Sequence, residues 1–558
     1  MVPLCARARR QRGRSQGKAH ICREARLWRS HPRCLASVAR GSADREGGEG
    51  WRGGMRVRGG STRVVRALLL ATLGSLAVRG AGTARASPTQ LPGRAVTLDA
   101  RAFGAVGDGV TDNTASIEAA LRNASKHARD GGATLVFPGP GVYMSAPFNL
   151  TSNCTLWIGA NATIKAVDDF ERFPVVAPLP GYGTGRDHLG PRRAPFIGGY
   201  NLTDVVIAGD NGTIDGAGWE WWYAHLDGRE AATNITRPRL IELMFTTGLV
   251  ITNVTLVNSP FWTVHPYACE NVTARFLTIL NHQPSPNTDG FDPDSSQDVL
   301  VEHSYFQVGD DGVAIKSGWD CAGLEFGRPS RNIFIRNLTV NSPKAAGVCI
   351  GSEMSGGVEN VTVVNSHFVN CHAAVRLKSS STRGAYIRNV TFANSTSEDV
   401  AITLFVSDFY GDPNPACNAS YVAPEMPRLS GITLENWFGQ RSALAVDIEG
   451  LQDSPIEGVR VHNLTLGDSG GWRCSNVKGI ATECSPRPCG PLLSRRAREK
   501  QKLRTIALVL HIVAMFLFCV VGLARMLYLK RSKQSEVDTQ GRSHEYEAIR
   551  NSECPDGE

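Results

Sequence analysis

The sequence has few aromatic residues and almost no segment with the periodicity of an amphipathic helix. Phe, Trp and Tyr make up 7% of the chain, whereas glycine occurs 58 times. One helix is expected, over Asn113–Arg129, because Ile117, Ala120 and Leu121 fall on one of its faces. The pattern therefore excludes a helical bundle and favours many short strands joined by turns.

The cysteines lack the spacing of a zinc site, and we expect neither a metal nor a cofactor. Nine of the 14 cysteines lie between residues 154 and 489, so at least one of them is free or pairs elsewhere. Their connectivity cannot be deduced from sequence. Three of them lie close together near the end of this region, and we expect them to close the folded domain as a clasp: Cys474, Cys484 and Cys489.

The folded part of the chain has no excess of positive charge, although the whole chain carries a net charge of +8. Residues 1–66 contain 17 Lys or Arg against 4 Asp or Glu, whereas residues 87–494 carry a net charge of −11. The basic isoelectric point therefore reflects the two ends of the chain. It gives no reason to expect binding to nucleic acid.

The amino-terminal region contains no recurring apolar pattern before residue 67. We expect residues 1–54 to be a disordered basic leader and residues 55–86 to be a secretory signal peptide. The latter has a positive segment, the apolar run Ala67–Val78 and the small residues Ala84 and Ala86 before a cleavage point. On this hypothesis translation starts at Met55. A transit peptide or an uncleaved anchor is the alternative.

A second apolar run, Thr505–Ala524, is interrupted only by His511 and is long enough to cross a bilayer as a helix. A buried core helix is the alternative. We expect a basic stalk at 475–504, a transmembrane helix at 505–524 and a cytoplasmic tail at 525–558. The positive residues before the run weakly favour a cytoplasmic amino side, but the signal peptide commits the large domain to translocation.

Potential glycosylation sites are absent from the tail. All 15 Asn-x-Ser/Thr sequons lie between Asn123 and Asn463, in the region that we expect outside the membrane. Many of them fall in segments that resemble strands, so we do not expect all of them to be used. The predicted location is the cell surface or the secretory pathway, as a single-pass membrane protein with its large domain outside.

Residues 87–474 repeat a short phrase in which an asparagine precedes a β-branched, apolar strand. Short strands at a recurring period, without long helices between them, favour an all-β fold of the parallel β-helix type, capped by the helix near residue 113. A β-sandwich is the alternative, but it would contain hairpin turns. The phrase occurs at Asn253-Val254-Thr255-Leu256, Asn271-Val272-Thr273, Asn337-Leu338-Thr339-Val340, Asn360-Val361-Thr362-Val363, Asn389-Val390-Thr391-Phe392 and Asn463-Leu464-Thr465-Leu466.

Two acidic clusters lie one repeat apart, at Asn287-Thr288-Asp289-Gly290 and Gly309-Asp310-Asp311-Gly312. If one repeat is one coil of a β-helix, the clusters stack as neighbours on adjacent coils. Like-charge repulsion then raises one pKa and leaves the other carboxylates ionised, which suits hydrolysis of a glycosidic bond. Each tetrapeptide alone could be an ordinary turn, because Gly, Asn and Asp dominate turns.

These two clusters and their flanks resemble the polygalacturonases of glycoside hydrolase family 28. The resemblance extends over roughly residues 97–470, and the order of its motifs is specific. It implies a single-stranded, right-handed parallel β-helix of the pectin-lyase-like type. The matching segments are Phe103–Asp112, Gly212–Gly216, Ser285–Ser296, Val308–Gly318, Gly351–Gly357, Arg376-Leu377-Lys378 and Arg383-Gly384.

The resemblance implies roles for the acidic and basic residues of these motifs. Asp310 would be the general acid, and Asp289 and Asp311 would hold and deprotonate the attacking water, which gives inversion. Arg376 and Lys378 would bind the carboxylates of the substrate. Two more residues are expected to contact the substrate: Asn287, and Lys316, for which a structural ion pair is equally possible.

Two further features were interpreted from the same segments. Asp292 and Asp294 flank a proline, and we interpret them as turn residues. Most of the family carries Gly-His-Gly where this chain has Ala345-Ala346-Gly347, so Ala346 removes a side-chain donor that we place beside Asp310. Possible substitutes, each more readily explained as structural, are His265, His282, His303, His367 and His372.

The first hypothesis is therefore a monomeric, inverting hydrolase of α-1,4-linked galacturonic acid in pectin, an acidic polysaccharide of the cell wall. A pectate or rhamnogalacturonan lyase is the second, although it would need Ca²⁺ and a basic residue that abstracts a proton. A non-catalytic surface protein that binds the cell wall is the third. The sequence leaves open whether cleavage is internal or from a chain end.

Overall fold

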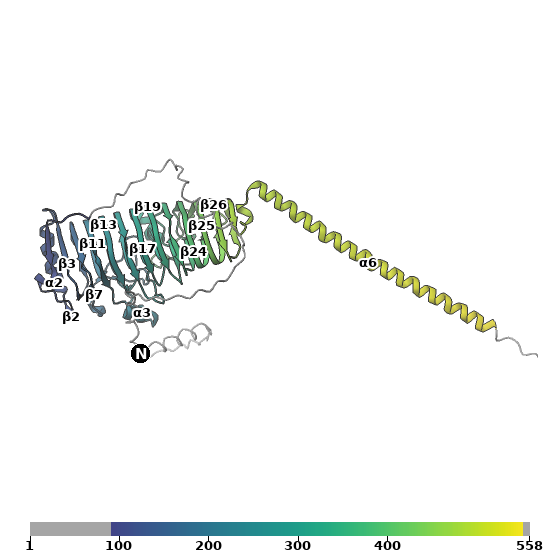
Figure 1. Cartoon of the computed structure of the whole chain (residues 1–558), viewed down its shortest axis with the longest axis horizontal. Coiled ribbons are helices and arrows are strands. Elements are labelled where there is room, and N and C mark those ends of the chain that lie inside the picture. The colour runs from purple at the N-terminus through teal and green to yellow at the C-terminus, as the bar shows by residue number, and fades with distance from the viewer. Residues whose placement is uncertain (1–90, 551–558) are drawn as a thin grey trace, which may run out of the picture. The chain divides into compact units, whose positions relative to one another are not determined.

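The computed structural model describes residues 91–550, of which Gln501 and residues 538–550 are described by their backbone alone. The expected leader at 1–54 and the signal peptide at 55–86 lie outside these residues. Most of the described chain forms one sheet of 22 strands that are stacked in coils (Figure 1). The strands of its first half are β1 (Val96–Asp99), β2 (Asp108–Asp112), β3 (Ala133–Phe137), β4 (Gly141–Ser145), β6 (Cys154–Ile158), β7 (Ala162–Ala166), β11 (Thr203–Asp215), β13 (Thr247–Val257), β15 (Glu270–Arg275), β16 (Thr278–Leu280) and β17 (Gln297–Gln307).

The second half continues the same stack. Its strands are β18 (Val313–Ile315), β19 (Ser330–Asn341), β20 (Ala346–Ile350), β21 (Val358–Val364), β22 (His367–Val369), β23 (Ala373–Lys378), β24 (Tyr386–Ser407), β25 (Arg428–Glu449), β26 (Ile456–Gly467), β27 (Trp472–Ser475) and β28 (Val477–Ser485). A smaller parallel sheet consists of β5 (Phe148–Asn149), β10 (Ile197–Tyr200), β12 (Ile241–Met244) and β14 (Val264–Tyr267).

Between residues 91 and 550, the ladders that join named strands are parallel except one, which pairs β8 (Val175–Val176) with β9 (Arg192–Arg193). Strand pairing therefore contradicts the β-sandwich alternative and confirms the parallel β-helix. Short helices punctuate the coils: η1 (Ala100–Phe103), η2 (Phe170–Arg172), α3 (Trp219–Leu226), α4 (Arg229–Thr233), α5 (Asp320–Phe326) and η3 (Gly490–Leu492).

The core lies inside the coils and is built from columns of apolar residues in register. One column runs through seven coils, and each of its members is at most 2% exposed. Because every coil adds a β-branched or leucine side chain at the same place, burial continues along the stack without a long helix. The column consists of Leu249, Val272, Val299, Ile333, Val361, Val390 and Ile432.

Asparagines turn the chain at the corners of the coils, among them Asn360 and Asn389 of the repeated phrase and Asn332, which bonds to Asn360 from the preceding coil. Asn332, Asn360 and Asn389 have φ angles of 58°, 57° and 54°, in the left-handed region that asparagine adopts more readily than most residues. Their side chains also form a ladder. Asn360 Nδ2 donates to Asn332 Oδ1 at 3.1 Å, and Asn389 Nδ2 donates to Asn360 Oδ1 at 2.8 Å. The recurring phrase is therefore a consequence of the coil geometry.

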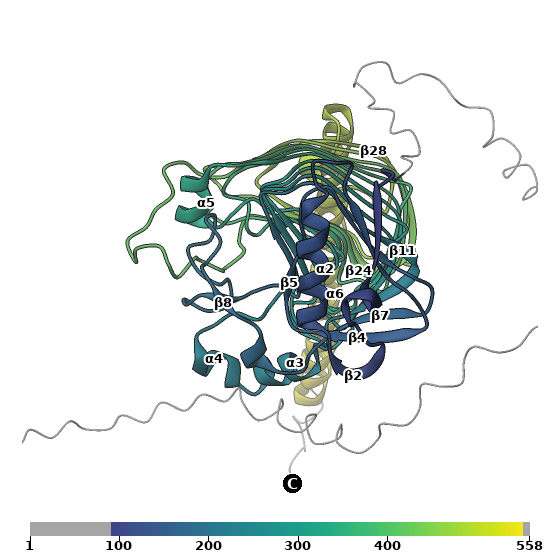
Figure 2. The same cartoon turned by 90° about the vertical axis from the view of Figure 1, so that its left-hand side faces the viewer.

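The expected cap helix is present as α2 (Thr114–Lys126) at the β1 end of the stack (Figures 1 and 2). Ile117, Ala120 and Leu121 are buried, as the sequence pattern predicts. Asn113 precedes the helix, and its side chain bonds to Val106 and Met144. This end of the core is thus shielded by one amphipathic helix.

The coils continue beyond the expected boundary at residue 474. Strand β28 pairs in parallel with β26, so the segment 477–485 belongs to the β-helix and the prediction of a stalk from 475 is wrong there. Cys474 forms a disulfide with Cys489, whereas Cys484 stays a free thiol, so the expected clasp uses two of the three cysteines. Four other cysteines of the described domain are free and buried: Cys154, Cys269, Cys349 and Cys371.

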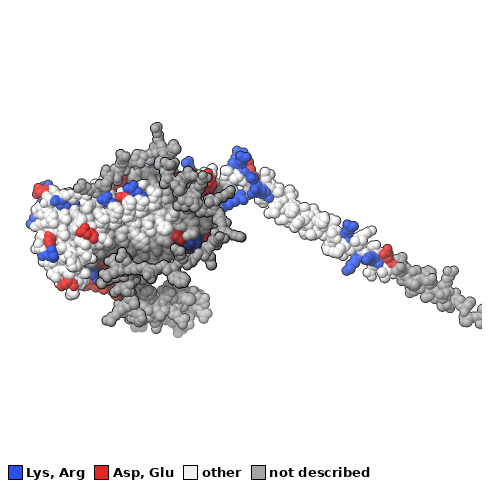
Figure 3. Space-filling model, viewed as in Figure 1, with Lys and Arg blue, Asp and Glu red and all other residues white. Residues whose placement is uncertain are grey.

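The last element is a continuous helix, α6 (Arg495–Arg550). It includes the predicted span at 505–524 together with part of the predicted stalk and tail. Figure 3 shows its uncharged stretch between two groups of Lys and Arg. Within the described chain, α6 is the helix whose length and composition would allow it to cross a membrane.

Candidate active site

The site lies on one face of the coil stack, where five neighbouring segments contribute residues in register. In Figure 2, α3, α4, α5 and β8 lie on the side of the stack where β5 is, and β11 lies on the opposite side. On the β5 side, β14 is followed by the segment 289–294, then by β18, β20 and β23. The pairs that fix the register are Val264↔Phe291, Phe291↔Val313, Asp294↔Lys316, Val313↔Val348 and Cys349↔Arg376.

The two acidic clusters are neighbours on adjacent coils. Asp289 lies two residues before Phe291, and Asp311 lies two residues before its partner Val313. One carboxylate oxygen from each of Asp289, Asp310 and Asp311 lies within 4.8 Å of the others. The prediction that the three acids converge is therefore confirmed.

The glycines that follow these acids allow the coils to approach closely. A Cβ atom added to Gly290 would lie 2.5 Å from the carbonyl oxygen of Gly312, and one added to Gly312 would lie 2.5 Å from that of Gly347. No side chain fits at such a distance. The Asp-Gly pairs thus allow acidic side chains to stack where the backbones nearly touch.

The three carboxyl groups differ in their affinity for protons. Burial alone would raise the pKa of Asp311, but the Lys378 ammonium and the Ala346 N–H outweigh it and lower this pKa. Their donor atoms lie 2.8 Å from Asp311 Oδ2 and Oδ1, respectively. Burial, followed by the charge of Asp311, raises the pKa of Asp310, which is partly exposed. Asp311 is therefore the carboxyl group that is most readily ionised.

The surroundings of Asp289 favour its protonated form. Burial and the neighbouring Asp292 and Asp310 raise its pKa well above the ordinary value. Asp292 itself is fully buried, and burial raises its pKa to about 7. The interpretation of Asp292 as a turn residue is therefore wrong, because its side chain lies in the acidic cluster.

Asp294 is also buried, which contradicts its interpretation as a turn residue. Its Oδ2 accepts a hydrogen bond from Tyr182 Oη at 2.5 Å and lies 3.3 Å from His265 Nε2. On its other side, His265 Nδ1 lies 2.8 Å from Glu242 Oε2. The two carboxylates raise the pKa of His265 against the effect of burial. His265 is thus a structural histidine between two acids.

Lys316 lies among carboxylates rather than at the surface. Its Nζ is 3.5 Å from Glu353 Oε2 and 3.7 Å from the nearest oxygens of both Asp289 and Asp292. The ammonium also lies 4.3 Å from the centre of the Trp262 ring. This surrounding favours the structural ion pair over a direct contact with substrate.

The two basic residues after the acids lie in different surroundings. Lys378 borders the same cavity as the three aspartates. Arg376, two residues earlier on β23, places its guanidinium 4.8 Å from the Phe405 ring and 5.6 Å from the Tyr410 ring. Arg376 does not line the cavity, so its predicted contact with substrate requires the side chain to turn out from between these rings.

Ala346 is next to Asp311 rather than Asp310. Val348, two residues after Ala346, pairs with Val313, two residues after Asp311, and the Ala346 N–H bonds to Asp311. The expected position beside Asp310 is therefore wrong. The histidine of the usual motif would stand beside the ionised carboxylate. None of the histidines in the described region lines the cavity.

A cavity of about 370 Å³ joins these groups, and several of its lining residues come from segments without any repeat. Asn287 lines it, as predicted, and its Oδ1 accepts a hydrogen bond from Arg237 at 2.7 Å. Sequence reasoning missed five lining residues that no motif or period marks as neighbours: Arg186, Asp187, Phe261, Trp262 and Tyr410. Ser352 and Glu353 also line the cavity; they lie in the matching segment Gly351–Gly357, but no role was predicted for them.

The chain matches a family model described as glycosyl hydrolases family 28, over residues 135–486. A probable polygalacturonase of Vitis vinifera is 38% identical over 395 residues, which cover 70% of this chain and 79% of the relative. An endo-polygalacturonase of Pectobacterium carotovorum subsp. carotovorum is 28% identical, over 65% of this chain and 86% of the relative.

Solved structures are similar over the same region. An exopolygalacturonase from Thermotoga maritima has a TM-score of 0.61 and 29% identity, covering 70% of this chain and 91% of the other. A polygalacturonase from Erwinia carotovora has a TM-score of 0.55 and 25% identity, covering 70% of this chain and 98% of the other. These relatives share the right-handed parallel β-helix. The chain therefore belongs to the glycosyl hydrolases of family 28.

Proposed function

We propose that this chain hydrolyses α-1,4-linked galacturonic acid in pectin. The observation that supports the proposal most strongly is the convergence of Asp289, Asp310 and Asp311 within 4.8 Å, with pKa values shifted in opposite directions. A glycoside hydrolase needs one protonated and one ionised carboxyl group at the scissile bond. The polygalacturonases among its relatives supply the substrate class.

In the proposed mechanism Asp310 donates its proton to the glycosidic oxygen as the bond to the anomeric carbon breaks. Asp311 accepts a proton from the water that attacks this carbon. Each turnover consumes one water, and at its end Asp310 is ionised and Asp311 is protonated. Asp289, whose pKa is raised, hydrogen-bonds to this water. This differs from the sequence-based prediction, in which Asp289 and Asp311 shared the role of base.

The stereochemical outcome rests on the family rather than on the spacing. Carboxyl groups of inverting enzymes are typically about 6.5–9.5 Å apart, and those of retaining enzymes about 5–5.5 Å apart. The bound of 4.8 Å between nearest oxygens is short for inversion. We propose inversion because the resemblance to family 28 implies it, with Asp311, which is paired with Lys378, holding the water together with Asp289.

Lys378 is the cation at the cavity that we expect to contact a galacturonate carboxylate, because its ammonium already faces the three aspartates. Arg376 would join it on a neighbouring sugar by turning away from Phe405 and Tyr410. Such local cations are needed because the domain is acidic and its overall field repels an acidic polymer.

The proposed location is the outside of the cell, with α6 as the anchor. Two disulfides in the described domain and a helix of transmembrane length support this arrangement. If it is correct, the full chain expressed in a plant cell will sediment with membranes and resist alkaline extraction. Removing residues 495–558 will release the protein to the medium. Recovery of the full chain in the soluble fraction would contradict the anchor.

The activity is tested by incubating the full chain, in detergent, with polygalacturonate. We expect release of reducing ends that persists in a chelator and produces no ultraviolet absorbance of unsaturated sugars. Loss of activity in the chelator, together with such absorbance, would support the lyase instead. Binding to polygalacturonate without any cleavage would support the non-catalytic alternative.

A further inference from the structure

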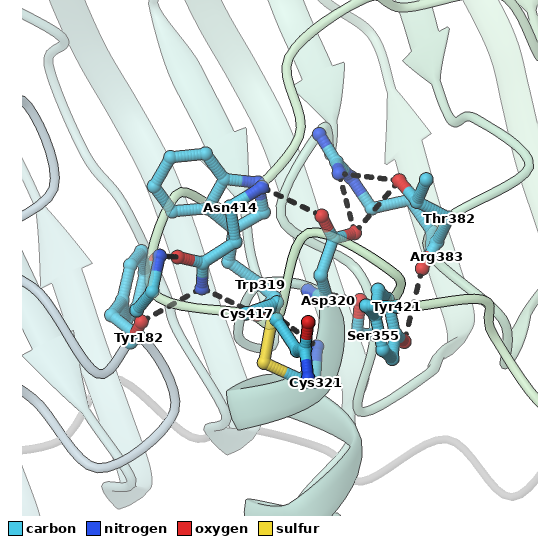
Figure 4. The surroundings of a disulfide bond; sticks show 12 residues. Tyr182, Trp319, Asp320, Cys321, Ser355, Thr382, Arg383, Asn414, Cys417 and Tyr421 are labelled. Carbon is cyan, nitrogen blue, oxygen red and sulfur yellow. Dashed lines mark hydrogen bonds and ion pairs between the residues drawn. A yellow bond between two sulfur atoms is a disulfide. The ribbon is translucent and has the colours of Figure 1, made fainter.

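Three segments outside the β-helix form a wall beside the cavity, which we call the loop wall: residues 179–187, 319–326 and 410–421. Arg186 and Asp187 of the first segment and Tyr410 of the third line the cavity directly. A disulfide between Cys321 and Cys417 joins the second segment to the third across 96 residues of sequence. Figure 4 shows the surroundings of this disulfide.

Asn414, which is 4% exposed, ties all three segments together. Its Nδ2 donates to the Tyr182 carbonyl at 2.8 Å and to the Trp319 carbonyl at 3.0 Å (Figure 4). Its backbone N–H donates to Asp320 Oδ2 at 2.7 Å. Because these bonds are buried and one partner is a carboxylate, breaking them is costly. The loop wall is therefore a fixed part of the site.

A second set of hydrogen bonds holds the third segment of the loop wall, residues 410–421, in place. Arg383, which is fully buried, donates to Asp320 Oδ1 at 2.5 Å and to the Asp412 carbonyl at 2.6 Å. Trp319 Nε1 donates to the same carbonyl at 3.0 Å. These bonds fix the backbone of Asp412, and its side chain points toward Arg186.

Arg186, which lines the cavity, joins the first segment of the loop wall to the third segment and to Glu353. Its Nε donates to Glu353 Oε1 at 2.5 Å, and its Nη2 donates to Asp412 Oδ2 at 2.8 Å. The guanidinium also lies 4.4 Å from the centre of the Trp319 ring. The side chains of Glu353 and Arg186 are 3% and 18% exposed, so this ion pair is less screened than a surface pair, whereas the Asp412 side chain is 31% exposed.

A polymer that passed through the cavity on this side would have to displace a guanidinium held by two carboxylates. Resting on the proposed function, we propose that the cavity is closed at the Arg186–Asp412 bridge, so that the enzyme takes one end of the galacturonan chain and releases short products of uniform size.

The test follows product size during digestion of polygalacturonate by the full chain in detergent. The proposal predicts one short product from the earliest time points and little loss of viscosity for each reducing end formed. In Arg186→Ala, opening the bridge is expected to produce longer oligomers and to increase the viscosity loss per reducing end several-fold. Arg388→Ala, which removes the ion pair with the exposed-face Glu359, is the matched control and should retain the parental product.

Asp412→Asn is the second variant, because it weakens the bridge without removing the Arg186 side chain from the Trp319 ring. It should shift product size in the same direction. A mixture of oligomers from the parental chain at the first time point would overturn the proposal while leaving hydrolysis established. Unchanged products in both bridge variants would also overturn it. Absence of any cleavage would instead overturn the proposed function on which it rests.

Discussion

Lys378 Nζ donates to Asp311 Oδ2 at 2.8 Å, from a strand that lies two coils further along the stack. This contact joins the residue expected to bind the substrate to the carboxylate expected to activate water. It also explains why Asp311, although buried, keeps a pKa below its ordinary value. On the proposed mechanism, binding of an anionic sugar is therefore coupled to the protonation of these acids.

The first prediction concerns the acid limb of the pH profile. Asp311 must be ionised, so activity falls as the pH drops through its lowered pKa. Lys378→Met removes the main stabilising cation and moves the acid limb of kcat to higher pH. The fractional loss of kcat will then be larger at about pH 4 than at about pH 6.

Lys344→Met is the control for this change, because Lys344 is exposed and donates to the Pro284 carbonyl. It should leave the shape of the profile unaltered. A uniform loss of kcat in Lys378→Met at every pH would mean that Lys378 does not set the pKa of Asp311.

The second prediction concerns stereochemistry. Hydrolysis with inversion releases the β-anomer first from an α-linked substrate, and mutarotation then produces the α-anomer. Proton NMR during the first minutes of digestion measures the order in which the two appear. Initial formation of the α-anomer would indicate retention, which the short spacing of the carboxylates would then explain.

The third prediction concerns the pH dependence of stability. Asp408 is 1% exposed, and burial raises its pKa to about 7. Between about pH 4 and pH 7 the folded protein binds a proton that the unfolded chain has lost. Its stability therefore falls as the pH rises through this window, by up to about 4 kcal/mol.

Asp408→Asn removes this titration. The melting temperature of the variant relative to the parent should increase from about pH 4 to pH 7 and then remain constant, as measured by calorimetry at several pH values. Parallel curves for the two proteins would show that Asp408 ionises normally in the folded state.

The fourth prediction concerns the asparagine ladder. Asn360→Ala removes a donor to Asn332 and an acceptor for Asn389, and it places alanine at a φ of 57°. The expected loss is about 1–2 kcal/mol in the free energy of unfolding, measured with denaturant. Asn360→Gly, which tolerates this φ, should lose less. An equal loss of unfolding free energy in both variants would mean that the hydrogen bonds, and not the positive φ angle, account for the whole effect.

The convergence of Asp289, Asp310 and Asp311 was predictable because the spacing of the repeats in the sequence gives the length of a coil. Asp289 and Asp310 are 21 residues apart, and the strand phrases recur at similar distances, so stacking follows once the parallel β-helix is recognised. The cap helix α2 was predictable for a similar reason, since Ile117, Ala120 and Leu121 have helical spacing.

Residues whose position depends on register or on loops could not be placed in this way. Ala346 was assigned to Asp310 because the pairing of Val313 with Val348 is not visible in the sequence. Asp292 resembled a turn residue because a proline follows it, although its side chain is fully buried in the acidic cluster. Arg186 comes from a segment with no repeat, so only the fold brings it to the cavity.

The most direct measurement of the central claim is the rate of reducing-end release from polygalacturonate by three proteins, namely the parent, Asp310→Asn and Asp311→Asn. Each substitution keeps the shape of the side chain but removes its ability to exchange a proton. The account predicts a loss of kcat on the order of 10²–10⁴-fold in each variant, with circular dichroism unchanged. Parental rates in both folded variants would contradict it.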